Sequence, residues 1–242
     1  MNINSLLYLM LSLLFIGCSP TFYQPNNINT PMLKEEKQIR IGGSFGNSNN
    51  LNLEIAVAPI NHLGLIGTFS TFNPDKNKEG EGGNGKINEG GIGYFNNFYK
   101  NFIIDAYRIY GKGNVKNYFI NRSIQNMSKL NANIERFGLQ GSIGYSSKYF
   151  EINQSFRYLK LNYYDIKGNL VWATLNQIDL LNNNRNNWLF EAAITIRAGI
   201  DPIKFQYQVV KSTNLTKHDF PLNSINISLG LVTNMQFRKK IK

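Results

Sequence analysis

Cys18 is the residue best placed to carry chemistry in this chain of 242 residues, because it is the only cysteine and directly follows an apolar run. A thiol can act as a nucleophile, bind a metal or carry a covalent group. A single cysteine excludes an internal disulfide and a cluster of cysteine ligands. The run LLYLMLSLLFIG (Leu6–Gly17) has the length of a signal-peptide core and is short for a membrane-spanning helix. We therefore expect export and a covalent role for Cys18.

Residues 15–18, Phe-Ile-Gly-Cys, resemble the lipobox of bacterial lipoproteins. A small residue before the cut fits the peptidase, and the cysteine must follow at once because its sulfur carries the diacylglycerol. Phe15 departs from the commoner leucine, and Met1–Ser5 contains no Lys or Arg. An ordinary cleaved signal, or an uncleaved anchor with an incidental cysteine, is the alternative. The resemblance implies removal of residues 1–17 and acyl chains such as palmitate on Cys18, an effectively permanent membrane anchor.

Two histidines are the candidates for a general base, which nucleophilic catalysis needs. His62 falls in an expected short turn. His218 stands beside Asp219 in a long connection, with Ser212 and Ser224 nearby in sequence. Some outer-membrane enzymes that act on lipid place such residues at a barrel rim, which leaves a lipid-modifying enzyme as an alternative. We expect solvated loop histidines instead and predict no catalytic residue and no enzymatic activity.

The glycine-rich stretch Lys76–Lys86 lacks the strand-to-helix setting and the GK[ST] ending of a phosphate-binding loop. Asp75, Glu79 and Glu81 do not have the spacing of a calcium loop. The sequence therefore predicts no cofactor and no metal site.

A formal charge of +11, from 26 Lys+Arg and 15 Asp+Glu, would attract phosphates of lipid head groups, lipopolysaccharide or nucleic acid. The basic residues are scattered through the expected loops, with one cluster at Arg238-Lys239-Lys240. An export signal argues against nucleic acid, so we expect contact with lipopolysaccharide or lipid. The oligomeric state stays open.

From Gln38 onward, apolar and polar residues alternate with period two, which predicts half-buried strands. Several expected strands approach the length of about 9–11 residues that a tilted strand needs to cross a bilayer. The sequence thus predicts an all-β fold, a single antiparallel up-and-down barrel of about ten strands (eight to twelve). The strands are expected at Gln38–Gly46, Leu51–Ala58, Leu63–Phe72, Asn88–Phe95, Phe102–Tyr110, Ile134–Tyr145, Tyr149–Leu159, Trp188–Gly199, Ile203–Ser212 and Ser224–Thr233.

Short and long connections alternate, as they do in outer-membrane barrels with short periplasmic turns and long outer loops. An even strand count returns both barrel ends to the periplasm, in agreement with a lipid in the inner leaflet. Short helices are expected at Ser123–Leu130 and Ala173–Leu181. The short turns are Pro59–His62, Asn96–Asn101, Ser146–Lys148 and Ile200–Pro202, and the long stretches Asn73–Ile87, Lys112–Asn133, Asn162–Asn187 and Thr213–Asn223.

Three prolines, Pro20, Pro25 and Pro31, disfavour helix or central strand in the segment before Gln38. We interpret this segment as a tether that holds the domain away from the membrane. The predicted organisation is a signal peptide at 1–17, a lipidated tether at 18–37 and a barrel at 38–242.

The alternation does not by itself tell inside from outside. In a membrane barrel the apolar face meets lipid and polar groups fill the lumen, whereas a soluble lipocalin-like barrel, which would bind an apolar ligand, has the opposite sense. Charges of both signs among small residues favour a narrow, ion-paired lumen. They are Arg40, Glu54, Glu89, Arg136, Glu151, Arg157, Glu191, Arg197 and Lys204.

Several features of the chain resemble uncharacterised outer-membrane β-barrel lipoproteins of Bacteroidota. They are the lipobox, the stretches Tyr23-x-Pro25 and Asn29-x-Pro31-Met32-Leu33-Lys34-Glu35, the strand with Gly42-Gly43, and the alternation of strands with short and long connections. The resemblance implies an outer-membrane location in a Gram-negative bacterium and a barrel fold, and brings no catalytic residue. The expectation is a non-enzymatic envelope protein, structural or interacting through its long surface loops.

Overall fold

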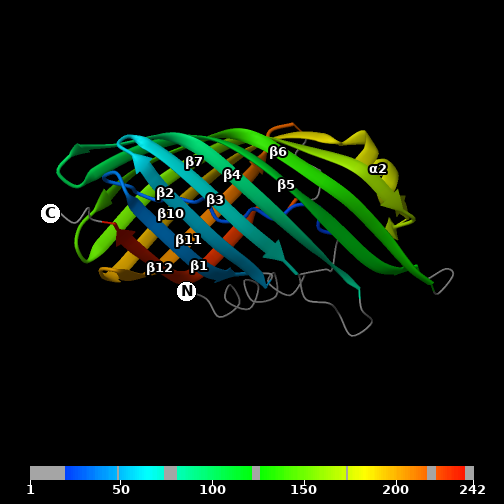
Figure 1. Ribbon diagram of the computed structural model, residues 1–242. Coiled ribbons are helices and arrows are strands. Elements are labelled where there is room, and N and C mark those ends of the chain that lie inside the picture. Colours follow the sequence, from blue (N-terminus) through cyan, green and yellow to red (C-terminus); the bar gives the residue numbers. More distant parts are fainter. Residues whose placement is uncertain are drawn as a thin grey trace, which may run out of the picture.

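The computed structural model describes residues 20–47, 49–73, 81–121, 126–172, 174–216 and 222–237. Ten antiparallel strands close into one barrel in the order β1-β12-β11-β10-β7-β6-β5-β4-β3-β2, which confirms the predicted fold class (Figure 1). Strands β8 (Val171–Trp172) and β9 (Leu175–Asn176) form a separate small sheet beside helix α2 (Gln177–Asn183). The barrel strands are β1 (Gln38–Gly46), β2 (Asn50–Ile60), β3 (Leu63–Phe72), β4 (Gly82–Tyr99), β5 (Phe102–Asn121), β6 (Asn126–Ser146), β7 (Phe150–Gly168), β10 (Asn186–Ile200), β11 (Ile203–Asn214) and β12 (Ile225–Gln236).

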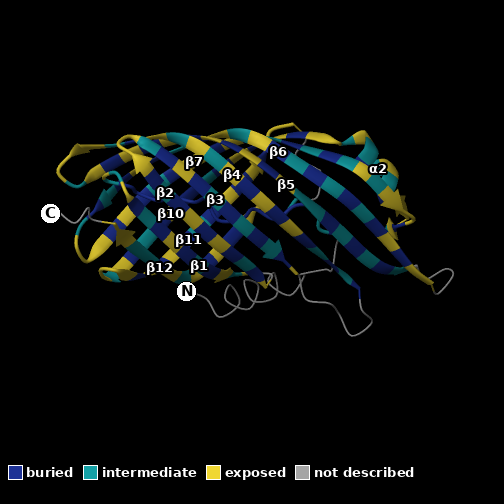
Figure 2. Ribbon diagram, viewed as in Figure 1, coloured by how far each residue is buried: buried dark blue, intermediate teal, exposed yellow. Residues whose placement is uncertain are grey.

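The alternating pattern points its apolar side outward. In β1, Arg40 and Ser44 are buried, whereas Ile41 and Phe45 are exposed. The same checkered pattern of buried and exposed residues covers the barrel in Figure 2. The structure also fixes which face of Phe102–Tyr110 points inward, a strand whose two faces are both largely apolar in the sequence, and it places Asp105 inside. The alternative of a soluble barrel with an apolar lining along these strands is therefore wrong.

All connections fall at two ends of the barrel. The short-turn end carries the β2–β3, β4–β5, β6–β7 and β10–β11 turns together with the start of β1 and the end of β12. The long-loop end carries α2, β8, β9 and the remaining connections. Among the described residues, no helix has the length and apolar character needed to cross a membrane.

Strands β4 to β7 are much longer than a bilayer requires, since they contain 18–21 residues where about 9–11 suffice. The predicted long loop Lys112–Asn133 is wrong, because β5 and β6 pair without interruption from Phe102↔Tyr145 to Asn121↔Asn126. The helix expected at Ser123–Leu130 is also wrong for residues 126–130, which belong to β6. We call these extensions the wall (residues 82–88, 112–121, 126–135 and 160–168).

The helix expected at Ala173–Leu181 exists in part as α2, at Gln177–Asn183. Its N-cap is Asn176, whose side-chain oxygen accepts hydrogen bonds from the backbone N–H groups of Ile178 and Asp179. Such a cap satisfies backbone donors that the first helical turn leaves without partners. The helix lies at the long-loop end, where Leu181 is buried in the apolar cluster described below.

Candidate functional site

The lumen holds one group of paired charges near the short-turn end. The Glu151 carboxylate contacts three basic groups, Arg40 at 2.7 Å, Lys204 at 2.9 Å and Arg197 at 3.2 Å. All four side chains are buried. Buried charges of this kind are tolerated only when they are paired and hydrogen-bonded. The cluster ties together β1, β7, β10 and β11 across the lumen.

A second group of paired charges lies toward the long-loop end. Arg157 donates to Glu191 at 2.6 Å and contacts Glu89 at 3.2 Å, and Arg136 contacts the other oxygen of Glu89 at 2.7 Å. The prediction of a narrow, ion-paired lumen is confirmed. Each of the nine charged residues assigned to the polar face is buried: Arg40, Glu54, Glu89, Arg136, Glu151, Arg157, Glu191, Arg197 and Lys204.

The N-terminal segment, residues 20–37, runs through this lumen and is called the plug. Residues 22–33 are all buried, and Figure 1 shows the segment in blue inside the barrel. At the long-loop end the Thr21 N–H donates to the Asn117 side chain at 3.0 Å. At the short-turn end the Lys34 ammonium donates to the Ser146 carbonyl at 3.2 Å. The interpretation of this segment as a spacer outside the barrel is therefore wrong for residues 20–33.

Side chains of the plug complete the ion-pair network. The Tyr23 hydroxyl donates to Glu191 at 2.7 Å and accepts from Arg136 at 2.8 Å. The Asn26 side-chain oxygen accepts from Arg136 at 2.6 Å and from Arg157 at 2.8 Å. Without the plug, these guanidinium groups would lose acceptors that no other described residue supplies at the same positions. The segment is thus a structural part of the lumen.

The middle of the plug is held through backbone and amide groups. Gln208 donates to the Ile28 carbonyl at 2.9 Å and accepts from the Ile28 N–H at 2.8 Å. Asn27 donates to Ser44 at 2.8 Å and accepts from Ser228 at 2.9 Å. The three prolines suit this path, because a proline brings no N–H that would need a partner in the lumen.

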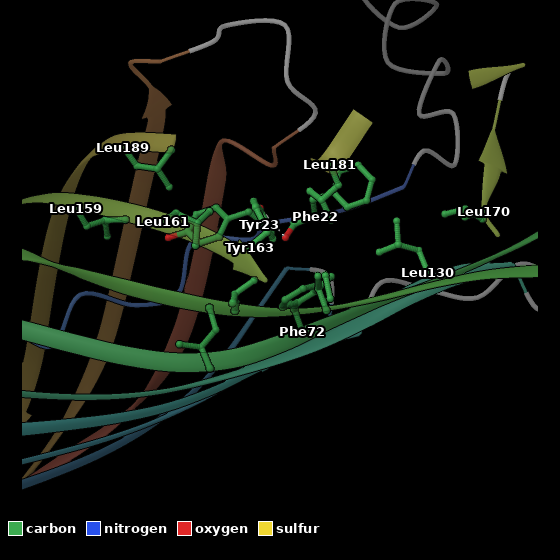
Figure 3. Packing of buried hydrophobic residues seen from close by; sticks show 14 of the residues in the cluster. Phe22, Tyr23, Phe72, Leu130, Leu159, Leu161, Tyr163, Leu170, Leu181 and Leu189 are labelled. Carbon is green, nitrogen blue, oxygen red and sulfur yellow. Dashed lines mark hydrogen bonds between the residues drawn. The ribbon is translucent and has the colours of Figure 1, made fainter. Parts of the chain in front are cut away.

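An apolar collar surrounds the plug where it reaches the long-loop end. Phe22 is fully buried there among side chains from β3, β4, β5, β6, β7, α2 and β10 (Figure 3). The buried members are Phe22, Tyr23, Phe72, Ile87, Val115, Phe119, Leu130, Ala132, Ile134, Leu159, Leu161, Tyr163, Leu170, Leu181 and Leu189. The collar packs against the plug, so the barrel is filled by its own chain at this end.

The predicted candidates for catalysis and metal binding do not assemble into a site within the described residues. His62 lies in the β2–β3 turn, with its Nδ1 3.1 Å from the Phe95 carbonyl and its ring stacked on Tyr94. Glu81 accepts a hydrogen bond from the Ile120 N–H at 2.9 Å. Among the described residues, no three His, Cys, Asp or Glu side chains could hold a metal ion together. Cys18, Asp75, Glu79 and His218 lie outside the described residues.

None of the family models matches the chain, and none of the curated proteins compared with it does either. Three solved structures have a backbone fold similar to that of this chain. The KdgM porin is 13% identical, covers 83% of this chain and 99% of its own, and has a TM-score of 0.38. The N-terminal β-barrel domain of Pseudomonas aeruginosa OprF is 9% identical, with coverages of 83% and 99% and a TM-score of 0.36. The translocator domain of autotransporter NalP from Neisseria meningitidis is 10% identical, with coverages of 83% and 86% and a TM-score of 0.44. At these identities and TM-scores, the similarities carry no argument about function.

Proposed function

We propose that this chain is a non-enzymatic outer-membrane β-barrel lipoprotein, lipidated on Cys18, that acts through the surface at its long-loop end. The observation that carries the proposal is an inversion of the alternating pattern along single strands. A strand that leaves a bilayer for water must exchange its apolar outer face for a polar one. A barrel surrounded by water along its whole length has no reason for such a change.

Strand β5 shows the exchange on its outer face. From Phe102 to Tyr110 the outer face is mainly apolar, while the inner face holds Asp105 among buried apolar residues and stays largely apolar beyond Tyr110. Beyond Tyr110 the outer face carries Lys112 and Lys116, while Val115 points inward and is fully buried. Strand β7 shows the full inversion, because its inner face changes from Arg157 to Leu161 and its outer face changes from Tyr158 to Lys160. These changes support a membrane surface near Tyr110 and Tyr158.

The filled lumen supports a role outside the barrel rather than in transport. The charges of the two ion-pair clusters are paired, and residues 22–33 of the plug occupy the space between the walls. A ten-stranded barrel is narrow even without such a segment. The wall and the loops around it are then the surface that can meet a partner.

Replacing Leu229 with arginine tests the membrane assignment. Leu229 lies on β12 and is 65% exposed. If the outer face meets lipid, the L229R barrel should lose about 2–4 kcal/mol of unfolding free energy, the cost of arginine near the bilayer midplane. Reversible urea unfolding in lipid vesicles measures this loss.

Met235→Arg is the matched control, because Met235 faces outward on the same strand near the short-turn end. We expect a cost of about 0–1 kcal/mol there, as for positions near the interface. Equal and negligible costs at both positions would contradict the proposal, since an arginine on a water-exposed face costs little at either place.

For the partner we propose the anionic phosphates of lipopolysaccharide. A pocket of about 380 Å³ on the wall is lined by Lys116, Lys129 and Lys167 from three neighbouring strands. Asn131 pairs with Lys116 on one side and with Lys167 on the other, so the two lysines flank Asn131 and lie near Lys129 on the same strand as Asn131. The three lysines lie beyond the membrane surface placed at Tyr110, on the outer side in the proposed orientation.

The triple variant Lys116→Gln, Lys129→Gln, Lys167→Gln should bind purified lipopolysaccharide more weakly. The expected loss is about 1 kcal/mol for each lysine at low salt, and it should shrink as ionic strength rises. Binding isotherms of the refolded barrel measure it. The control exchanges Lys37, Lys100 and Lys148, exposed lysines at the short-turn end, for glutamine with the same change in charge. Equal losses in both triple variants would show that net charge, rather than this pocket, attracts lipopolysaccharide.

A further inference from the structure

The plug enters the lumen from the long-loop end, and three contacts fix this entry. The Asn117 side chain accepts from the Thr21 N–H at 3.0 Å and donates to the Thr21 carbonyl at 3.1 Å. Phe22 is fully buried in the collar. The Tyr23 carbonyl accepts from the Asn223 N–H at 3.0 Å. Asn117 lies in the wall, seven residues beyond Tyr110 in β5, so this entry is on the outer side of the proposed membrane surface.

The plug leaves the lumen at the opposite end and turns into β1. The Lys34 N–H donates to the Gln38 side chain at 2.8 Å, and the Lys37 N–H donates to the Ala58 carbonyl at 2.6 Å. From Gln38 the chain runs back toward the long-loop end as β1. The direction of the chain in the lumen is therefore fixed at both ends, with the earlier residues at the long-loop end.

Covalent geometry then limits where a group on Cys18 can be. Cys18 itself lies outside the described residues, and only Ser19 separates it from Pro20, which is buried at the long-loop end. Two peptide units span at most about 7 Å. The apolar band of a membrane barrel is about 25 Å tall, so this linker is too short to reach the leaflet at the short-turn end.

We propose that the N-terminus emerges on the outer side of the membrane, so that the acyl chains on Cys18 lie on the cell-surface side and not in the inner leaflet. This inference rests on the proposed lipidation and orientation. It replaces the expectation of an inner-leaflet anchor, which assumed that the chain before β1 stays at the short-turn end. It also requires the barrel to close around the plug, because the ion-paired lumen and the collar leave no room for acyl chains to pass later.

The test places one flexible epitope at three positions and detects it with antibody on intact and on permeabilised cells. The positions are after Ser19, after Asn169 at the long-loop end and after Lys148 at the short-turn end. Metabolic labelling with an alkyne fatty acid reports lipidation of the same proteins. We expect the Ser19 and Asn169 epitopes to be stained equally before and after permeabilisation, and the Lys148 epitope to be stained only after it.

A Ser19 epitope that behaves like the Lys148 epitope, in a protein that carries fatty acid, would overturn the inference and leave the proposed lipoprotein intact. An outward Ser19 epitope without fatty acid would remove the lipid from the proposed function and leave the threading direction supported. A second measurement needs no insertion. Ser19→Cys should react with a membrane-impermeant maleimide on intact cells as Lys167→Cys does, and a reaction confined to lysed cells, as for Lys148→Cys, would contradict the inference.

Discussion

Deletion of residues 20–35 is expected to convert a closed barrel into an ion-conducting pore. The deletion removes the twelve consecutive buried residues 22–33 from the lumen. It joins Ser19 to Glu36, two residues before β1 begins at Gln38, so the strand itself is left intact. Removing Phe22 and Tyr23 leaves the apolar collar at the long-loop end without its centre, and the rest of the vacated space is lined by polar and charged side chains, which water and ions can solvate. Planar bilayer recordings should show steady open-channel currents for the deletion variant, whereas the intact protein should show none.

The selectivity of that pore should be weak. The lumen contains as many acidic side chains as basic ones among the described residues that are buried on the barrel strands. The basic ones are Arg40, Arg136, Arg157, Arg197 and Lys204, and the acidic ones are Glu54, Glu89, Asp105, Glu151 and Glu191. A lumen with no excess of either sign has little reason to prefer cations or anions. Reversal potentials under a salt gradient should therefore stay close to zero.

A synthetic peptide with the sequence of residues 20–36 provides the matched control for the deletion. Added to the open pore, it should reduce the current, because Gln208, Asn226 and Ser44 are again available to its Asn27 and Ile28. A scrambled peptide of equal composition should not. A deletion variant that folds, as judged by the heat-dependent shift of its electrophoretic mobility, but conducts no current would contradict the view that the plug closes the lumen.

The sequence predicts the barrel well for strands in which each face keeps the same polarity from one end to the other. In β1 the alternation of Arg40 and Ser44 with Ile41 and Phe45 is sufficient, because each face has a single character along the whole strand. The wall is missed because the outer face changes its polarity within a strand. At residues 112–120 the outer face includes Lys112 and Lys116, and the stretch resembles a polar loop unless Val115 and Phe119 are recognised as the continuation of the inner face.

The plug could not be predicted from its own residues. Pro, Asn and Thr in this density are typical of an irregular linker, and the partners that order it are distant in sequence. The Tyr23 hydroxyl binds Glu191 and Arg136, 168 and 113 residues away. The one available signal was the polar face of the strands, whose buried charges need more acceptors than they offer each other. That face indicates a lumen that has to be filled, and leaves open what fills it.

Replacing Arg157 with methionine is expected to destabilise the barrel more than any substitution on its outer face. The Arg157 side chain is fully buried and pairs with Glu191 and Glu89, and it also donates to the Asn26 oxygen of the plug at 2.8 Å. Methionine keeps much of the volume and removes the charge, which leaves two buried carboxylates short of a cation. Breaking a buried ion pair from one side costs about 3–5 kcal/mol. Urea unfolding in vesicles should show a loss of that size.

The double variant Arg157→Met, Glu191→Gln separates the uncompensated charge from lost packing. If the carboxylate left behind carries the cost, removing its charge should return a substantial part of the lost unfolding free energy, and the two changes should be strongly non-additive. Lys148→Met, on an exposed turn, should change the unfolding free energy by no more than about 0.5 kcal/mol. Additive losses would mean that Glu191 is satisfied by Tyr23 without Arg157. The plug, rather than the ion pair, would then be the main support of this part of the lumen.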